Sequence, residues 1–142
     1  MEEDVGGPNI GRRPPDFASA LLAFEVAEGL LVSAKNYLDN ENFPEALSES
    51  KNAIRTAASA LLLKEGYVAS TLESTISYLE HNHPSALPVE NWRIVENMNV
   101  SGLFSIIMKL LKKSTDQGDV NKAILIAEEF LNSAKNILED RK

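Results

Sequence analysis

The chain lacks cysteine and has only two histidines among its 142 residues. Without cysteine it can form neither disulfides nor thiolate sites, and it suits a reducing compartment, so we expect a cytoplasmic protein. Residues 1–16 have no apolar core of the kind found in a signal peptide. Uninterrupted apolar runs extend for only a few residues, which predicts no membrane-spanning helix and no membrane partner.

Positive charge is also scarce. Fourteen lysines and arginines face 21 aspartates and glutamates, so the formal net charge is −7 at pH 7. Because neutralisation of phosphates supplies most of the non-specific affinity for nucleic acids, this balance argues against broad DNA binding. A local basic patch is still compatible with it. The hydrophobic share of 44 % and the charged share of 25 % are ordinary for a globular domain.

Motifs for phosphate and metal binding are missing as well. Neither G-x-x-x-x-G-K-[ST] nor G-x-G-x-x-G occurs. His81 and His83 form an H-x-H pair, for which Glu80 or Glu90 would be a third ligand. The pair directly precedes Pro84, and a surface loop is the favoured interpretation. We therefore predict no metal site and no cofactor.

The sequence also contains no recognisable catalytic motif. No motif singles out a serine or threonine next to a base. Four carboxylates gather near one expected helix–helix connection: Asp39, Glu41, Glu45 and Glu49. A general acid–base pair could be drawn from them, but a solvated acidic rim is favoured. No catalytic residue is predicted, and an enzymatic role is disfavoured.

Helical periodicity dominates what is present, and no segment alternates apolar and polar residues as a strand would. The expected helices span 15–39, 44–65, 70–81, 89–98, 102–114 and 120–142. This predicts an all-α, up-and-down antiparallel bundle of five to six helices, with two long helices near the termini and a helical hairpin. Residues 1–16, with three glycines and three prolines, are expected to be a flexible tail. Residues 17–142 are expected to form one domain.

One phrase occurs twice. SAKNYLDN occupies 33–40 and SAKNILED occupies 133–140, and an ungapped alignment of 24–40 with 124–140 gives eight identities in seventeen positions. The favoured interpretation is two long helices that pack in the same bundle, with the alanines and leucines of the phrase as core positions. Four polar residues are expected to lie toward solvent or at the edges of the helix interface: Lys35, Asn36, Lys135 and Asn136. An ancestral duplication or a shared polar role is the alternative.

Basic residues provide the candidate ligand site. Lys51 and Arg55 are four residues apart and share a helix face, with Asn52 beside them. These three are the candidate ligand-binding residues, and a solvated or salt-bridged face is the favoured alternative. A second basic group and two aromatic residues that could stack on bases are Lys109, Lys112, Lys113, Trp92 and Tyr37.

The stretch AKNYLDNENFPEALSESKNAIRTAASALLLKEG resembles the HEPN family, small helical proteins associated with nucleotides and RNA. The resemblance covers roughly 27–80. The residues that carry it are Ala34, Leu38, Ala46, Ala53, Ala60, Leu61, Leu62, Leu63 and Gly66. Many members have Glu and Lys where this chain has Arg55 and Ser59. Ribonuclease members have Arg, four to six residues, then His, and no arginine stands at that distance before either histidine.

The resemblance thus implies the scaffold rather than the ribonuclease. It also implies a homodimer, or pairing with a partner such as a nucleotidyltransferase. We expect a non-catalytic helical interaction module that binds a nucleotide, RNA or a partner protein. The alternative is a tetratricopeptide-like adaptor, since 37–54 and 116–134 look like parts of such repeats, although three contiguous units of about 34 residues are not found. A nuclease with an atypical site is the third interpretation.

Overall fold

The structure, a computed structural model, describes residues 9–98 and 116–140. Its elements are β1 (Ile10–Arg12), α1 (Phe17–Asp39), α2 (Phe43–Glu65), β2 (Tyr67–Ala69), α3 (Leu72–Asn82), α4 (Val89–Glu96) and α6 (Asp116–Glu139). Helices dominate, which confirms the all-α prediction. The helix expected at 102–114 and the lysines within it lie outside the described residues.

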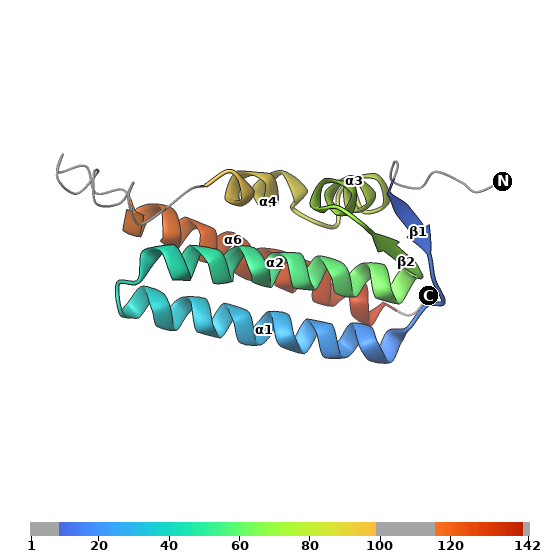
Figure 1. Ribbon diagram of the computed structural model, residues 1–142, viewed down its shortest axis with the longest axis horizontal. Helices are drawn as coiled ribbons and strands as arrows, with labels where there is room; N and C mark the ends of the chain where they lie inside the picture. Colours follow the sequence, from blue (N-terminus) through green and yellow to red (C-terminus); the bar gives the residue numbers. More distant parts are fainter. Residues whose placement is uncertain (1–8, 99–115, 141–142) are drawn as a thin grey trace.

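Three long helices form the body of the bundle (Figure 1). α1 and α2 make the expected hairpin, and α6 packs against both. α6 runs in the same direction as α2 and antiparallel to α1 (Figure 1). The short helices α3 and α4 lie on the side of α2 away from α1, where α4 also contacts α6 (Figure 1). The two helices that carry the repeated phrase therefore pack in one bundle, as predicted.

Alanine spacing explains how closely α1 and α2 approach. Ala46, Ala53 and Ala60 recur every seven residues on α2, and all three are fully buried. Ala27 of α1 is fully buried too. Small side chains at a helical contact allow the backbones to come close together, so this seam favours an intimate hairpin.

Local signals define the ends of the hairpin helices. Asp16 precedes α1, and its carboxylate accepts hydrogen bonds from the Ser19 backbone N–H at 3.0 Å and the Ser19 hydroxyl at 2.7 Å. These bonds lower the pKa of Asp16. Pro44 lies in the first turn of α2, and Gly66 ends α2 with a left-handed φ of 86°. A helix needs such caps because its terminal backbone groups lack partners within the helix.

A two-stranded sheet is the main departure from the predicted architecture. β1 pairs antiparallel with β2, with Ile10 opposite Ala69 and Arg12 opposite Tyr67. Residues 9–16, expected to belong to a flexible tail, are instead held to the end of α2, where Arg13 N–H donates to the Gly66 carbonyl at 3.0 Å. Each strand has only three residues, too few to produce a recognisable alternation in the sequence.

α1 bears on a second expectation, that no helix is apolar enough to span a membrane. By length and composition alone, 17–39 is long and apolar enough to do so, as a core helix of a globular protein also can be. Glu25 and Glu28 interrupt its apolar runs without making the helix polar overall. In the structure Ala20, Phe24, Ala27 and Ala34 are buried in the bundle. Only 22 % of the most apolar stretch is buried, so much of the apolar surface of α1 faces outward.

Candidate functional site

The three candidate ligand-binding residues lie on α2 next to α4. Arg55 makes a bidentate ion pair with Glu96: Nε donates to Oε2 at 2.8 Å, and Nη2 donates to Oε1 at 2.7 Å. Lys51 donates from Nζ to the Met98 carbonyl at 2.7 Å. Asn52 is half-buried beside them. Lys51 and Arg55 share a helix face, as expected. Arg55 connects α2 to α4, and Lys51 connects α2 to Met98, which follows α4.

Glu96 is the centre of this contact. Its carboxylate also accepts a hydrogen bond from Trp92 Nε1 at 3.0 Å. Burial opposes the charge on Glu96, but the hydrogen bonds from Arg55 and Trp92 outweigh it and hold the pKa of Glu96 below its ordinary value. Trp92 is fully buried and packs edge-on against Phe130. Trp92 is therefore a core residue, and the proposed stacking on bases is wrong for it.

A polar groove extends from Arg55 across α3 and α4. Its volume is about 490 Å³. It is lined by Arg55, Leu72, Glu73, Ile76, Arg93, Glu96 and Asn97. Arg93 reaches Glu73 at 3.3 Å and Glu80 at 3.2 Å. Each guanidinium in this groove already faces a carboxylate, so an anionic ligand would compete with Glu73, Glu80 or Glu96 for it.

The two histidines do not converge on a site. His83 Nε2 lies 2.7 Å from Glu65 Oε2. Glu65 Oε1 accepts a hydrogen bond from the Tyr78 hydroxyl at 2.6 Å. Tyr78 is 2 % exposed, and burial followed by the Glu65 contact raises its pKa. His81 is exposed. Within residues 9–98 and 116–140, no group of three or more His, Asp or Glu side chains could hold a metal ion.

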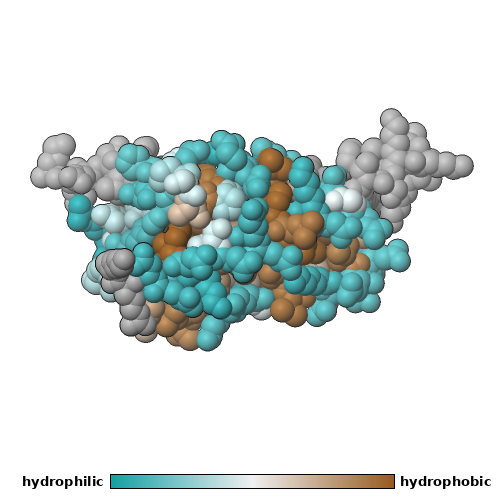
Figure 2. All heavy atoms as spheres, turned by 180° about the vertical axis from the view of Figure 1, so that it is seen from behind, coloured by the Kyte–Doolittle hydropathy of each residue, from teal (hydrophilic) through white to brown (hydrophobic). Residues whose placement is uncertain are grey.

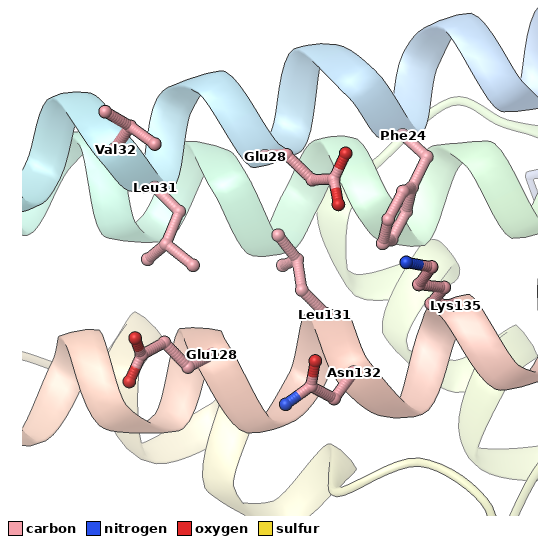
Figure 3. Close-up of a pocket in the computed structure, with 8 residues that line it drawn as sticks. All are labelled: Phe24, Glu28, Leu31, Val32, Glu128, Leu131, Asn132 and Lys135. Carbon is pink, nitrogen blue, oxygen red and sulfur yellow. The ribbon is translucent and has the colours of Figure 1, made fainter.

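A second groove runs between α1 and α6 (Figure 3). Its volume is about 450 Å³. It is lined by Phe24, Glu28, Leu31, Val32, Glu128, Leu131, Asn132 and Lys135. Lys35 of α1 forms an ion pair with Glu128 of α6 at 2.5 Å. The groove thus combines an apolar base with charges of both signs on its rim.

A family model, the HEPN domain, matches residues 20–138, which is most of the chain. This chain belongs to the HEPN family. The match extends well beyond 27–80, the part that carried the sequence resemblance, and includes α4 and α6. Searches of curated proteins and of solved structures gave no match.

In this HEPN domain the repeated phrase divides into a buried half and an exposed half. Ala34 and Ala134 are fully buried and Leu138 is 1 % exposed, while Leu38 is half-buried. The four polar residues of the phrase are exposed, as predicted: Lys35, Asn36, Lys135 and Asn136. Packing explains the apolar half. The polar half contributes Lys135 to the lining of the α1–α6 groove, and Lys35 forms an ion pair with Glu128, which also lines it.

The sequence did not reveal the outer surface of this HEPN domain. Four apolar residues of α1 are exposed by 40–63 %: Leu21, Leu22, Val26 and Val32. We call these four the α1 outer face. Leu125 of α6 is 65 % exposed. Figure 2 shows apolar patches within the otherwise polar surface of the molecule seen from behind. The sequence signal for this surface is the high apolar content of 17–39. A single buried helical stripe does not account for all of these apolar residues.

Proposed function

We propose that this HEPN domain is a non-catalytic interaction module that binds another macromolecule through the α1 outer face and the adjoining groove. The observation that carries the proposal is the exposure of Leu22 at 63 %, Val26 at 57 % and Val32 at 58 % on one helix. Grouped apolar side chains in contact with water are typical of docking surfaces. We propose a cytoplasmic location for the interaction.

The state of the polar side chains supports a role without catalysis. The Arg-x4–6-His pattern of the ribonuclease members is absent from the sequence. His83 is held by Glu65, and Arg55 is held by Glu96. In the described part of the chain these groups stabilise contacts between helices. The HEPN match over residues 20–138 argues against the tetratricopeptide-like alternative.

Cleavage of RNA is the direct test of the non-catalytic part. We expect the purified chain to leave a mixed-sequence RNA intact for as long as buffer alone does. Cleavage that co-elutes with the protein and disappears in a His81→Ala, His83→Ala double variant would contradict the proposal. Cleavage that persists in the double variant but disappears in Arg55→Ala would also contradict the proposal.

Photo-crosslinking tests the docking surface. A photoreactive residue at Val26, on the α1 outer face, should give a discrete adduct in an extract of the native cells. The matched control is the same residue at Ile94 of α4, which is 42 % exposed and lies away from α1. Discrete adducts from Val26 but not from Ile94 support the proposal. Adducts from neither position, or the same adducts from both, contradict it.

The polar groove favours a second candidate function, the binding of a nucleotide or RNA at Arg55, which is the one of the three candidate residues that lines it. Lys51 and Asn52 share the helix with Arg55 but do not line the groove. The support for this function is a space of about 490 Å³ that contains Arg55 and Arg93. A fluorescent RNA oligonucleotide should then bind with an affinity that Arg55→Gln lowers and Lys122→Gln on α6 does not. Equal affinities for the two variants would exclude this site. A partner protein such as a nucleotidyltransferase, which the family resemblance implies, would be found by co-purification.

A further inference from the structure

We propose that the groove beside β2 binds an extended, acidic segment of a partner protein, which adds to the two-stranded sheet as a third strand. β2 lies on the side of α2 away from α1 (Figure 1). The proposal therefore concerns a surface other than the α1 outer face and does not depend on the function proposed for that face. It rests on a strand edge whose backbone groups have no partner and on the charge of the groove along this edge.

The ladder between β1 and β2 begins and ends in hydrogen-bonded pairs. Arg13 N–H donates to the Gly66 carbonyl, and Ser70 N–H donates to the Asn9 carbonyl, each at 3.0 Å. In an antiparallel ladder, hydrogen-bonded pairs alternate with pairs that exchange no hydrogen bonds. The two end pairs therefore determine which residues between them are bonded.

Tyr67 and Ala69 are the residues of β2 whose backbone groups are free. Val68 lies opposite Gly11, and the alternation makes this a hydrogen-bonded pair. The N–H and C=O groups of Tyr67 and Ala69 then point to the edge of β2 away from β1. In residues 9–98 and 116–140 no backbone group pairs with them there. An unpaired edge of this kind is a template for a further strand.

A groove of about 230 Å³ lies along this edge. All three residues of β2 line it, and none of the three residues of β1 does. Its remaining lining includes Leu62 and Leu63 of α2 and Thr75 of α3. The groove continues between α2 and α3 into a second space of about 260 Å³, which reaches Arg55. The two spaces together follow the course that an extended chain beside β2 would take.

The unpaired edge favours a polypeptide over other ligands. A peptide backbone repeats N–H and C=O groups at the spacing of a strand, so it can bond to Tyr67 and Ala69 together, whereas a sugar–phosphate backbone cannot. Alternate side chains of an added strand point to the same side and provide specificity. Val68, which is 49 % exposed, and the two leucines offer apolar contacts to every second side chain.

Arg13 determines the charge of the expected partner. Its side chain lines the groove and is exposed, and no carboxylate is among the described residues that line either space. Asp16 attracts Arg13, but its oxygens already accept hydrogen bonds from Ser19. Arg12, at the same end, lies 5.7 Å from the centre of the Tyr67 ring. In a chain of net charge −7, this region is complementary to an acidic segment.

The first experiment measures binding of three fluorescent peptides of about eight residues to the full chain. In one peptide valine alternates with glutamate, in the second valine alternates with lysine, and the third is the glutamate peptide with methylated backbone nitrogens. We expect a dissociation constant below roughly 100 µM for the glutamate peptide. The other two should bind at least about ten-fold more weakly, because one has the wrong charge and the other lacks backbone donors. No binding of the glutamate peptide up to roughly 1 mM, or equal binding of all three, overturns the proposal.

Two arginine variants test the position of the site. Arg13→Gln should weaken binding of the glutamate peptide about three-fold or more. The matched control is Arg93→Gln on α4, which lines neither of the two spaces and should leave the affinity unchanged. Circular dichroism shows that both variants are folded. Equal affinities of the two variants overturn the proposal.

Amide hydrogen exchange tests the added strand itself. In the complex with the glutamate peptide, the N–H groups of Tyr67 and Ala69 should exchange about ten-fold more slowly or less, because they gain acceptors. The N–H of Val68, already bonded to Gly11, is the internal control and should change little. Unchanged exchange at Tyr67 and Ala69 in the saturated complex overturns strand addition.

Other occupants of the groove would give different results. Binding of a fluorescent RNA oligonucleotide that Arg13→Gln abolishes, without binding of the glutamate peptide, would overturn the proposal in favour of RNA. A full-length variant that combines Glu2→Gln, Glu3→Gln and Asp4→Asn should bind the glutamate peptide as tightly as the wild type. Binding that is about ten-fold tighter in this variant would assign the groove to the chain's own carboxylates and overturn a partner segment as its occupant.

Discussion

Gly66 shows how a single residue determines the course of the chain. Its φ of 86° lies in the left-handed region that glycine adopts at low cost. A Cβ atom there would lie 2.9 Å from the Arg13 carbonyl oxygen and 3.0 Å from Pro15 Cγ. The turn at Gly66 directs the chain from α2 into β2, so backbone strain at this position affects both elements.

Substitution of two glycines by alanine should have opposite effects. Gly66→Ala should lower the free energy of unfolding by about 1–2 kcal/mol because of the strained φ and the close contacts. The control is Gly29→Ala within α1, where an added Cβ meets nothing within 4 Å. It should raise the free energy of unfolding by about 0.5–1 kcal/mol, since alanine favours the helix. Chemical denaturation measures both, and equal effects would contradict the argument.

Glu96 allows a pH prediction at the same scale. Its pKa is lowered, so the stabilisation from the Arg55 and Trp92 contacts is complete above the ordinary value of 4.5 and is lost as the pH falls through the folded-state pKa. Glu96→Gln should lower the free energy of unfolding at pH 7 by about 1–2 kcal/mol, a modest figure because Arg55 is partly exposed and water screens the pair.

The pH profile is what distinguishes a charge effect from a packing effect. The difference between wild type and Glu96→Gln should shrink as the pH is lowered below 4.5. Glu139→Gln, at an exposed position near the end of α6, serves as the control and should change the free energy of unfolding by less than about 0.5 kcal/mol. A difference for Glu96→Gln that stays constant with pH would show that its contacts do not depend on the charge.

At the scale of elements, α1 depends on its cap. Asp16 accepts two hydrogen bonds from Ser19 at the start of the helix, where a negative charge also interacts well with the helix dipole. Asp39 is exposed at the opposite end, where the dipole disfavours a negative charge. The two aspartates of one helix thus have opposite electrostatic surroundings.

Alanine substitution should reveal this difference. Asp16→Ala should lower the melting temperature, because the Ser19 backbone N–H and the Ser19 hydroxyl lose their hydrogen-bond acceptor. Asp39→Ala should leave the melting temperature unchanged or raise it. Thermal unfolding followed by circular dichroism at pH 7 compares them. A larger loss for Asp39→Ala than for Asp16→Ala would contradict the cap.

The elements also show how far sequence patterns reach. The bounds of α2 follow from Pro44 and Gly66, which act over a few neighbouring residues and can be recognised without a structure. The helix expected at 15–39 ends where α1 ends, but Asp16 is its N-cap and α1 begins at Phe17. For α3 the sequence offers two N-caps, Ser70, which has the capping-box spacing to Glu73, and Thr71. The capping box forms between Thr71 and Ser74, and local rules alone do not choose between the two positions.

At the scale of the molecule, the homodimer that the family resemblance implies should make stability depend on concentration. If a second copy of the chain binds only the folded state, the melting temperature should rise with protein concentration. Val32→Glu should remove that dependence, and Ile94→Glu should retain it. Calorimetry at several concentrations measures the effect. A wild-type melting temperature that does not change with concentration would contradict folded-state association.

The helical class, the hairpin, the alanine seam and the exposure of Lys35 and Lys135 follow from periodicity, because a helix repeats its contacts every three or four residues. Contacts between distant residues have no such local signature. The pairing of β1 with β2, the Arg55–Glu96–Trp92 cluster and the hydrogen bonds of Glu65 with Tyr78 and His83 came only from the packing of the helices. The sequence alone determined that its repeated phrase lies on two helices. Only the tertiary structure decided that these helices run antiparallel, and it is this direction that brings the charges of α1 and α6 to one groove.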